Sequence, residues 1–471
     1  MNSRIRLLVA AAALSLAGHV RAGEPPDPLR FSRGNWEVKL GAVGGLGAAG
    51  ESRAFWNVVA GVDPSYPYDP NRIWGEYWLF PGVTATFKTG SAGTFYGGLS
   101  VGVTGNIGSD LYQTPANGRA AIENLYLGWR HRGASSGLEI DLSGGAQNYS
   151  VGTGFLLFQG AQNGGVRGAT YAAPRTAWDM TGVARLRWKS LSADGFFLQY
   201  NQISGQPATQ LAGGKLEVAL GESQSAGVAY VDAIASTMPY VQATETILAS
   251  GRKGTRTAHL WATVRPLPKA LPDLSLSGEF AWQRNGRIDM KAWAAAGTAS
   301  CAFSKTGWKP TLSVTYAYFT GDDPATPAFE GFDPLFWNAG LANWATGGNG
   351  AFAWAPSNLV MYRVHAGAAP SAADTLDLFW FHISAARTDS PLALGQDLVS
   401  ALAQGIPVTS VGVPTRHLND GFAVQWQRSL GTRWTLTACL NFSAPGAGLS
   451  AVSNGTATTW VGGNLSAAFS Y

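Results

Sequence analysis

The chain has 471 residues, of which 60 are glycine, and only 13% are charged, about half the share that is usual in a soluble protein. The glycines have no three-residue period, which excludes a collagen, and the 46% hydrophobic content excludes an intrinsically disordered chain. Residues 1–22 hold three of the 33 basic residues, so the remainder has 30 bases against 29 acids and lacks the strong positive charge of a nucleic-acid-binding protein.

The N-terminal segment has the pattern of a secretory signal peptide. Arg4 and Arg6 precede the apolar run Leu7–Gly18, which is too short to cross a bilayer as a helix. Small residues before a cut after Ala22 complete the pattern. We therefore expect a signal peptide over residues 1–22 and a single exported domain over residues 23–471; a retained anchor is the less favoured alternative.

Period-two alternation of apolar and polar residues recurs along the rest of the chain. It is clear in "GLEIDLSG" (137–144), "WDMTGVARLRW" (178–188), "LSLSGEFAWQ" (274–283) and "RWTLTACLNF" (433–442). Such alternation predicts strands with one apolar and one polar face. A soluble β-sandwich also alternates, but its outward face is charged, whereas charge here is confined to one face of each segment. A closed barrel in a membrane fits this pattern, because closure satisfies every backbone hydrogen bond in lipid.

Eighteen such segments can be counted, and they predict an all-β fold, namely a transmembrane antiparallel up-and-down β-barrel. The segments begin near Asn35, Pro81, Thr94, Ala120, Leu138, Ala177, Gly195, Lys215, Ser225, Thr257, Leu274, Arg287, Pro310, Asn358, Thr375, Gly421, Arg433 and Thr458.

The connections alternate between long and short, as in bacterial outer-membrane barrels with short periplasmic turns and longer outer loops. This alternation places both termini in the periplasm. The exception is "RNG" (284–286), which predicts a three-residue hairpin with Gly286 in the left-handed conformation. That hairpin would pair Gln283 with Arg287.

The chain ends on "NLSAAFSY" (464–471), an alternating segment that finishes with an aromatic residue. A barrel has no sheet edge, so its last strand is expected to pair with its first. The segment resembles the terminal aromatic signature of outer-membrane proteins, which implies the barrel assembly machinery as a partner. A buried edge strand of a soluble sheet is the alternative.

Sequence motifs for catalysis or metal binding are missing. The five histidines beyond residue 22 show no HExxH spacing, and the chain has no GxSxG elbow. Cys301 and Cys439 fall on the twelfth and seventeenth predicted strands, too far apart for a disulfide. We expect no catalytic residue, no metal and no cofactor.

The polar face of the predicted strands is the expected pore lining. Its charges either select ions or merely pair across neighbouring strands, and we favour pairing for most of them. Arg185 and Arg187 stand out because they are two cations on one face of one strand. The candidate pore-lining residues are Arg130, Arg185, Arg187, Lys215, Glu279, Arg287, Asp289, Lys291, Arg363 and Arg433.

Two stretches carry a family resemblance, "VGTGFLLFQGAQNGGVRGATYAAPR" (151–175) and "WKPTLSVTYAYFTGDDPATPAFEGFDPLF" (308–336). A strand that runs into "GDDP…FDPLF" resembles the alginate export outer-membrane porins. The resemblance implies an 18-stranded barrel and a conduit for an acidic polysaccharide. However, bases exceed acids only slightly on the predicted inner face, which favours a channel more than it favours alginate. The pair Asp322 and Asp323 predicts a turn in preference to a cation site at the rim.

The sequence as a whole predicts a monomeric outer-membrane channel for polar or anionic solutes, in contact with outer-membrane lipid and lipopolysaccharide and without nucleic acid. The glycine-rich connections 146–175 and 320–357 are expected to fold inward and narrow the lumen. A barrel enzyme acting at the outer leaflet and an adhesin with a plugged lumen are the alternatives.

Overall fold

The computed structural model describes residues 29–54, 69–110, 117–161, 163–202, 207–221, 223–338, 354–392, 412–453, 455 and 457–471. The expected signal peptide, residues 1–22, lies outside these residues. Helices in the described part of the chain are short, and none is long and apolar enough to cross a membrane.

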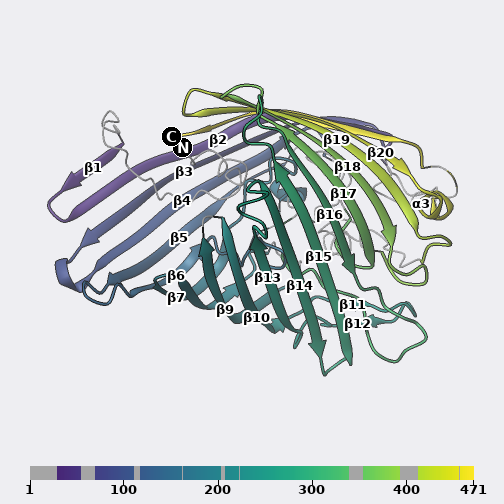
Figure 1. Ribbon diagram of the computed structural model, residues 1–471, viewed down its shortest axis with the longest axis horizontal. Helices are drawn as coiled ribbons and strands as arrows, with labels where there is room; N and C mark the ends of the chain where they lie inside the picture. The colour runs from purple at the N-terminus through teal and green to yellow at the C-terminus, as the bar shows by residue number, and fades with distance from the viewer. Residues whose placement is uncertain are drawn as a thin grey trace.

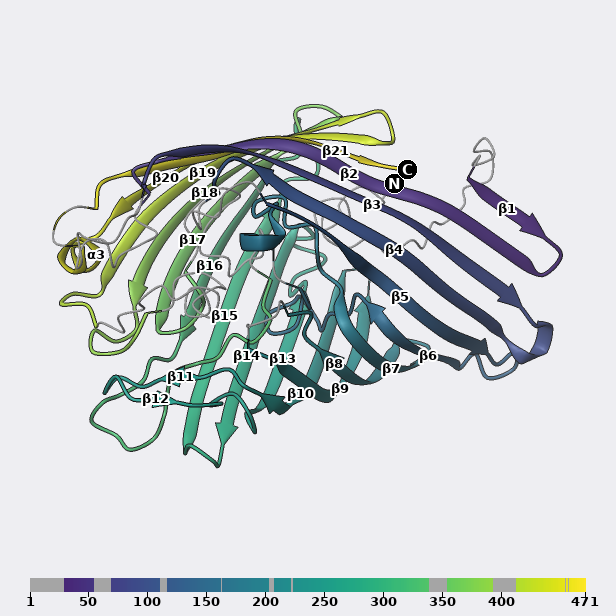
Figure 2. The ribbon, with the colours of Figure 1, turned by 180° about the vertical axis from the view of Figure 1, so that it is seen from behind.

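Eighteen long strands of the described residues form one antiparallel wall in which each strand pairs with its neighbours in the chain (Figures 1 and 2). The strands are β2 (Trp36–Ser52), β3 (Arg72–Lys88), β4 (Thr94–Ile107), β5 (Gly118–Arg132), β6 (Glu139–Gln147), β7 (Trp178–Trp188), β8 (Leu191–Gln199), β9 (Thr209–Gly221), β10 (Gln224–Ser236), β13 (Arg256–Val264), β14 (Leu274–Asn285), β15 (Met290–Ala302), β16 (Thr311–Phe319), β17 (Leu359–Ala368), β18 (Asp374–Ala385), β19 (His417–Leu430), β20 (Trp434–Pro445) and β21 (Trp460–Ser470).

Four shorter elements complete the described secondary structure outside the 3-10 turns. A separate two-stranded hairpin, β11 (Tyr240–Val241) with β12 (Ile247–Leu248), lies in the connection between β10 and β13. One helix, α3 (Ala447–Val452), lies between β20 and β21. The strand β1 (Arg30–Arg33) forms a hairpin with the start of β2.

The wall closes through the pairing of the first and last long strands. Val43 of β2 lies opposite Ser470 of β21, and Ser52 lies opposite Val461. The predicted closure and the predicted all-β barrel are therefore confirmed. The terminal segment also has the predicted faces, since Leu465 is 58% exposed on the outer side.

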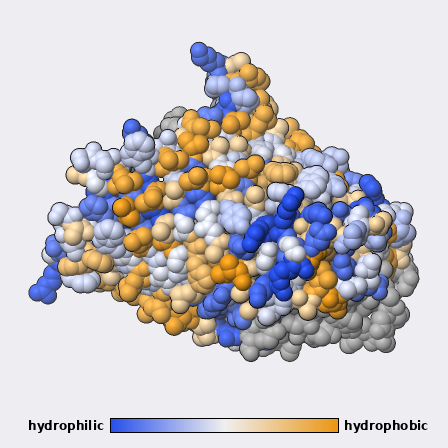
Figure 3. Space-filling view, turned by 90° about the horizontal axis from the view of Figure 1, so that it is seen from below, coloured by the Kyte–Doolittle hydropathy of each residue, from blue (hydrophilic) through white to orange (hydrophobic). Residues whose placement is uncertain are grey.

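The two faces of the wall differ in polarity, as the alternation predicted. Leu46, Ile73 and Leu127 are each more than 60% exposed on the outer face, whereas the inward neighbours Trp74 and Glu76 are buried. Figure 3 shows apolar residues spread over the outer wall, with hydrophilic residues gathered in separate clusters. An outward apolar surface over a closed hydrogen-bonded wall is what a bilayer requires.

Exposed aromatic side chains concentrate near both ends of the strands. Trp36, Trp188 and Trp434 lie beside short turns, while Trp282 and Trp293 lie beside the β14–β15 loop at the opposite end. Two such bands are typical of barrels whose ends lie at membrane–water interfaces.

The largest corrections to the predicted strand boundaries concern β2 and β3. β3 begins at Arg72 instead of near Pro81, and β2 continues to Ser52. The additional residues of the two strands pair with each other, and Glu51 of β2 lies opposite Arg72 of β3. The alternation was hidden in β2 because its second half consists mainly of glycine and alanine, which give no contrast between faces.

The β14–β15 hairpin also differs from the prediction. Asn285 pairs with Met290, so the loop has four residues and Gln283 lies opposite Ala292 instead of Arg287. The residue in the left-handed conformation is Asp289, with φ 46°. The predicted pairing of Gln283 with Arg287 is therefore wrong, and the strand that follows is shifted in register. The two cysteines remain thiols on β15 and β20.

Candidate functional site

Two long connections pair with each other inside the wall. The β6–β7 connection (148–177) and residues 320–338 of the β16–β17 connection meet in a short parallel bridge between Leu157 and Phe336. Three backbone hydrogen bonds of 2.8–2.9 Å join residues 154–158 of the first to residues 336–338 of the second. We call these two connections the interior belt. Both had been predicted to fold inward, and Leu156, Leu157 and Phe336 are buried.

The C-terminal half of the first connection binds carboxylates of the β2 and β3 wall. The backbone N–H groups of Tyr171 and Ala172 donate to the two oxygens of Glu76 at 3.0 and 2.9 Å. The Trp74 indole donates to the same carboxylate at 2.9 Å. The Tyr171 hydroxyl donates to Glu51. Glu76 therefore satisfies two loop amides that would otherwise be buried without partners, and Glu51 satisfies a loop hydroxyl.

Glu123 on β5 performs the same task nearer to β7. A register shift between β4 and β5 leaves Glu123 as the extra residue of a β-bulge, and its side chain is 3% exposed. It accepts backbone N–H groups from Thr176 and Ala177 at 2.9 Å and pairs with Arg175 at 2.8 Å. Bulges redirect side chains, and this one delivers a carboxylate to the belt.

The backbone of the belt packs closely against the backbone of β4 where two glycines meet. Gly168 has φ 65°, and a Cβ there would lie 2.6 Å from the Cα of Gly105. Nearby, Arg167 donates to the Asn201 side chain at 2.8 Å. Burial and the adjacent Arg175 lower the pKa of Arg167 to about 10, so this cation stays charged at neutral pH.

The N-terminal half of the connection packs on aromatic side chains of the opposite wall. The Phe155 ring stacks on the His259 and Phe319 rings with centroids 5.6 and 5.9 Å apart. His259 Nε2 lies 2.6 Å from Glu279, which also accepts the Thr153 hydroxyl. Glu279, a predicted pore-lining residue, is thus 8% exposed and anchors the belt.

The second connection is fixed by a buried ion pair. Asp333 accepts two bonds of 2.7 Å from the Arg252 guanidinium and one of 2.6 Å from the Tyr240 hydroxyl. Its backbone exchanges hydrogen bonds with the Gln283 amide at 2.7 and 2.8 Å. Burial opposes ionisation of Asp333, but the Arg252 cation outweighs it and holds the pKa of this carboxyl below its ordinary value.

A row of paired charges covers the inner face of β6 to β9. We call it the acid–base ladder. Its ion pairs are Arg187–Glu139 at 2.8 Å, Arg185–Asp141 at 3.4 Å, Lys215–Asp194 at 3.5 Å and Lys215–Glu217 at 3.4 Å. Pairing across neighbouring strands thus accounts for Arg185, Arg187 and Lys215, as the sequence favoured.

Two cations, one in this ladder and one beside it, still reach open space. The Arg187 side chain is 51% exposed even though it pairs with Glu139. Arg130, opposite Asp141 on β5, is exposed and lies over the Tyr96 ring at 5.8 Å. A carboxylate solute could therefore bind these guanidinium groups without breaking a buried pair.

The other predicted pore-lining residues lie elsewhere. Arg363 is 3% exposed and lies over the Phe379 ring at 4.8 Å. Arg287 and Asp289 lie in the β14–β15 loop, because that loop is longer than predicted. Lys291 pairs with Asp289 at 3.0 Å, and Arg433 lies in a turn over the Tyr471 ring at 3.8 Å.

Asp323 begins a turn, as the sequence favoured, because its carbonyl accepts the Thr326 N–H at 3.1 Å, whereas Asp322 lies buried before the turn. The Asp322 carboxylate accepts the backbone N–H groups of Ala243 and Glu330 at 2.7 and 2.8 Å. Asp323 accepts the Ala325 N–H at 2.9 Å and pairs with Arg387 at 2.9 Å.

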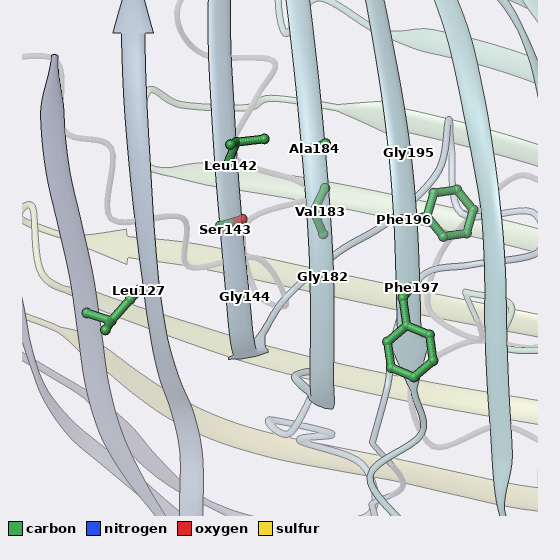
Figure 4. Close-up of a pocket in the computed structure, with 10 residues that line it drawn as sticks. All are labelled: Leu127, Leu142, Ser143, Gly144, Gly182, Val183, Ala184, Gly195, Phe196 and Phe197. Atoms are coloured by element: carbon green, nitrogen blue, oxygen red, sulfur yellow. The ribbon is translucent and has the colours of Figure 1, made fainter. Parts of the chain in front are cut away.

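A shallow groove of about 550 Å³ lies on the outer face of the wall, away from the belt. Figure 4 shows its floor at Gly144, Gly182 and Gly195, with Leu127 and Phe197 to the sides. The depression forms because adjacent strands have glycines at these positions, and glycine has no side chain to fill the space. It belongs to the apolar outer surface and gives no route through the barrel.

Sequence reasoning did not find the anchors of the belt. Glu123 and Arg175 are 52 residues apart, and Arg252 and Asp333 are 81 residues apart. The only available signal was the presence of single charged residues inside otherwise apolar and glycine-rich loops, which does not indicate their partners.

Comparison with known proteins supports the fold. No family model and no curated protein matches this sequence. Among solved structures, the chain is similar to the outer membrane protein OpdK of Pseudomonas aeruginosa, with 9% identity over 92% of this chain and 98% of that one, and a TM-score of 0.55.

Two further structures from Pseudomonas aeruginosa show the same likeness. OccK2 (OpdF) in complex with glucuronate has 11% identity over 92% of this chain and 97% of that one, with a TM-score of 0.53. The outer membrane protein OprD has 10% identity over 92% and 93%, with a TM-score of 0.51. The resemblance to alginate export porins stays a prediction. The chain has the fold of 18-stranded bacterial outer-membrane porins.

Proposed function

We propose that this chain is a channel of the bacterial outer membrane through which small polar solutes diffuse. The observation that carries the proposal is the wall itself, which is closed, apolar outside and charged inside, and which is narrowed by the interior belt. Short turns then lie in the periplasm, and both ends of the chain lie there as well, as in other outer-membrane barrels.

The solute class that best fits the interior is a small organic anion such as a sugar acid. Arg187 and Arg130 present exposed guanidinium groups, and a guanidinium binds a carboxylate through two parallel hydrogen bonds. The fold neighbour OccK2 (OpdF) was solved with glucuronate, which is a sugar acid. That precedent supports the class and does not name the solute.

An acidic polysaccharide such as alginate fits less well. A polyanion needs an excess of positive charge along its path, but each cation of the acid–base ladder has an acid beside it. A polymer would also have to pass a belt whose two connections are hydrogen-bonded to each other. A small acid needs only a gap beside the belt.

The test is single-channel recording in planar bilayers with a salt gradient. We expect a reversal potential that reports anion preference, and a loss of that preference in Arg130→Ala/Arg187→Ala. Arg284→Ala is the matched control, because Arg284 is a cation outside the ladder, exposed over the Trp282 ring. Cation preference in the unaltered protein would contradict the anionic class, and absence of conductance would contradict the channel.

A second measurement distinguishes a small sugar acid from an acidic polysaccharide as the transported solute. Proteoliposomes that contain the channel should swell in glucuronate and should not swell in oligomers of alginate. Swelling in both would show that the belt does not limit solute size.

A further inference from the structure

Three side chains with metal-binding atoms meet at the ends of β18 and β19 that carry the long connection. His382 Nδ1 lies 2.8 Å from one oxygen of Asp420, and His417 Nε2 lies 3.0 Å from the other. All three donor atoms lie within 4.8 Å of one another. This cluster lies outside the interior belt and outside the acid–base ladder, and the proposed channel makes no use of it.

A β-bulge brings the third side chain to the cluster. His382 and Asp420 are direct partners across β18 and β19, so their side chains share a face. His417 is three residues before Asp420 and would face the other way in a regular strand. A register shift between Ile383 and Ser384 places His417 opposite Ser384, which returns its ring to the face of Asp420.

Packing holds the two imidazole rings in place. They stack with centroids 4.9 Å apart and an angle of 20° between their planes. Gly446, just before α3, lies so close that a Cβ there would be 2.7 Å from Cγ of His417. The side chains of His382, His417 and Asp420 nevertheless keep 33, 39 and 41% exposure, so an ion can reach them.

The cluster lies on the outer face of the wall beside an aromatic band. The His382 ring lies 6.2 Å from the rings of both Tyr362 and Trp380, and these two side chains are exposed. Aromatic residues mark membrane–water interfaces in barrels. The cluster therefore lies where the wall meets water, at the ends of β18 and β19 next to the connection between them; Figure 1 shows these two strands side by side.

We propose that His382, His417 and Asp420 form a binding site for a divalent transition-metal ion, with zinc as the reference ion. Two imidazoles and one carboxylate are zinc ligands, and ligands about 2.0–2.2 Å from one ion lie roughly 3–4 Å from each other. The ion takes the place of the two ring protons that now point at Asp420. Its fourth position is open to water, and hard ions such as Mg²⁺ do not compete because imidazole suits softer metals.

A hydroxyl group contacts the ring nitrogen of His382 that does not face the proposed ion. Ser384 Oγ lies 3.3 Å from His382 Nε2, so the ring can donate its remaining N–H there while Nδ1 holds the ion. Such outer contacts fix the tautomer and the orientation of a metal-binding histidine.

The same three groups in a row, Ser384, His382 and Asp420, also have the order of a nucleophile, a base and an orienting acid. The position of His417 decides against that assignment, since it binds the second oxygen of Asp420 and completes a three-ligand set. A second row on the wall, Ser313, His365 and Asp377, has no third metal-binding side chain among the described residues, so the two rows serve as an internal comparison.

The experiment is zinc binding to the full-length protein in detergent, measured by isothermal titration calorimetry. We expect one Zn²⁺ per chain, with affinity lowered at least about tenfold in His382→Ala/His417→Ala. His131→Ala is the control, because His131 stacks on Trp129 and belongs to neither row. Both variants should keep the thermal unfolding temperature of the metal-free protein, which separates loss of the site from loss of the fold.

Two further readouts test the assignment. Zinc should raise the unfolding temperature of the unaltered protein but not of the double variant, since a ligand of the native state stabilises it. Equal zinc binding by the double variant would overturn the proposal, as would displacement of zinc by equimolar Mg²⁺. Covalent labelling of Ser384 by a fluorophosphonate, without zinc uptake, would overturn it in favour of ester hydrolysis.

Discussion

The two halves of the β6–β7 connection are held by different chemistry. Residues 163–177 lie on buried acids of the wall: Glu76 of β3 and Glu123 of β5 accept backbone N–H groups, and Glu51 of β2 accepts the Tyr171 hydroxyl. Residues 149–161 lie on aromatic rings of the opposite side and on the second connection. A glycine-rich loop can thus be fixed inside a barrel in two ways, by giving its amides charged acceptors or by burying its few large side chains.

The largest effect is expected at the carboxylate-bound half. Glu123→Ala would leave Arg175 without its acid and would leave two buried amides without an acceptor. The combined loss should be at least about 5 kcal/mol for this segment. Hydrogen exchange of residues 163–177, followed by mass spectrometry, measures it, and channel recordings should show added noise.

Two variants control this prediction. Glu123→Gln keeps the shape and part of the hydrogen bonding, so its effect should be smaller. Glu217→Ala removes an acid of the ladder whose ion pair is with Lys215 of the wall. Exchange in Glu123→Ala that equals the unaltered protein would show that the carboxylate does not hold the loop.

A smaller effect is expected at the aromatic half. Phe155 is 1% exposed and contacts His259 and Phe319, so Phe155→Ala should destabilise residues 149–161 by about 3–4 kcal/mol through loss of buried surface and the cavity left behind. Its exchange protection should fall while that of residues 163–177 changes little. Equal loss in both halves would mean that the connection moves as one body, and Phe155→Leu should restore most of the protection.

The smallest effect is a pH dependence of the second connection. Because the pKa of Asp333 is held below its ordinary value, its contribution to stability is complete above about pH 4 and is lost as the pH falls through the lower folded value. Hydrogen exchange of residues 329–337 should therefore report the same stability at pH 7 and pH 5. Asp333→Asn should be less stable at both, and the difference should narrow in stronger acid. A marked change between pH 7 and pH 5 would contradict the depressed pKa.

The strands of the wall could be predicted because the alternation of apolar and polar residues is a property of each segment by itself. Alternation along single segments such as 178–188 and 274–285 reports which face meets oil, so strand number and order followed from the sequence. It failed in β2, where glycine and alanine carry no contrast, and at the β14–β15 loop, where one additional residue reverses the faces.

The interior could be predicted only in outline. Most ladder pairs join neighbouring strands, as Arg185 with Asp141 and Arg187 with Glu139 do, so pairing of this kind was expected from strand order although the partners were not named. The anchors of the belt did not, because Glu123 faces inward only through a bulge and Asp333 meets Arg252 through a folded loop. His417 and His382 were separated in sequence and were united by a second bulge, which alternation alone does not reveal.

The short strand β1 has a consequence for how the barrel closes. On β2, Ala42 exchanges hydrogen bonds with Tyr471 at the end of the chain, and Leu40 bonds to Leu29 at the start of the described chain. β1 and β21 therefore lie end to end along the same edge of β2. Only one residue of β2 separates Leu40 from Ala42. If β21 slid by two residues toward this rim, its end would collide with β1, and so the hairpin acts as a stop that sets the register of the final seam.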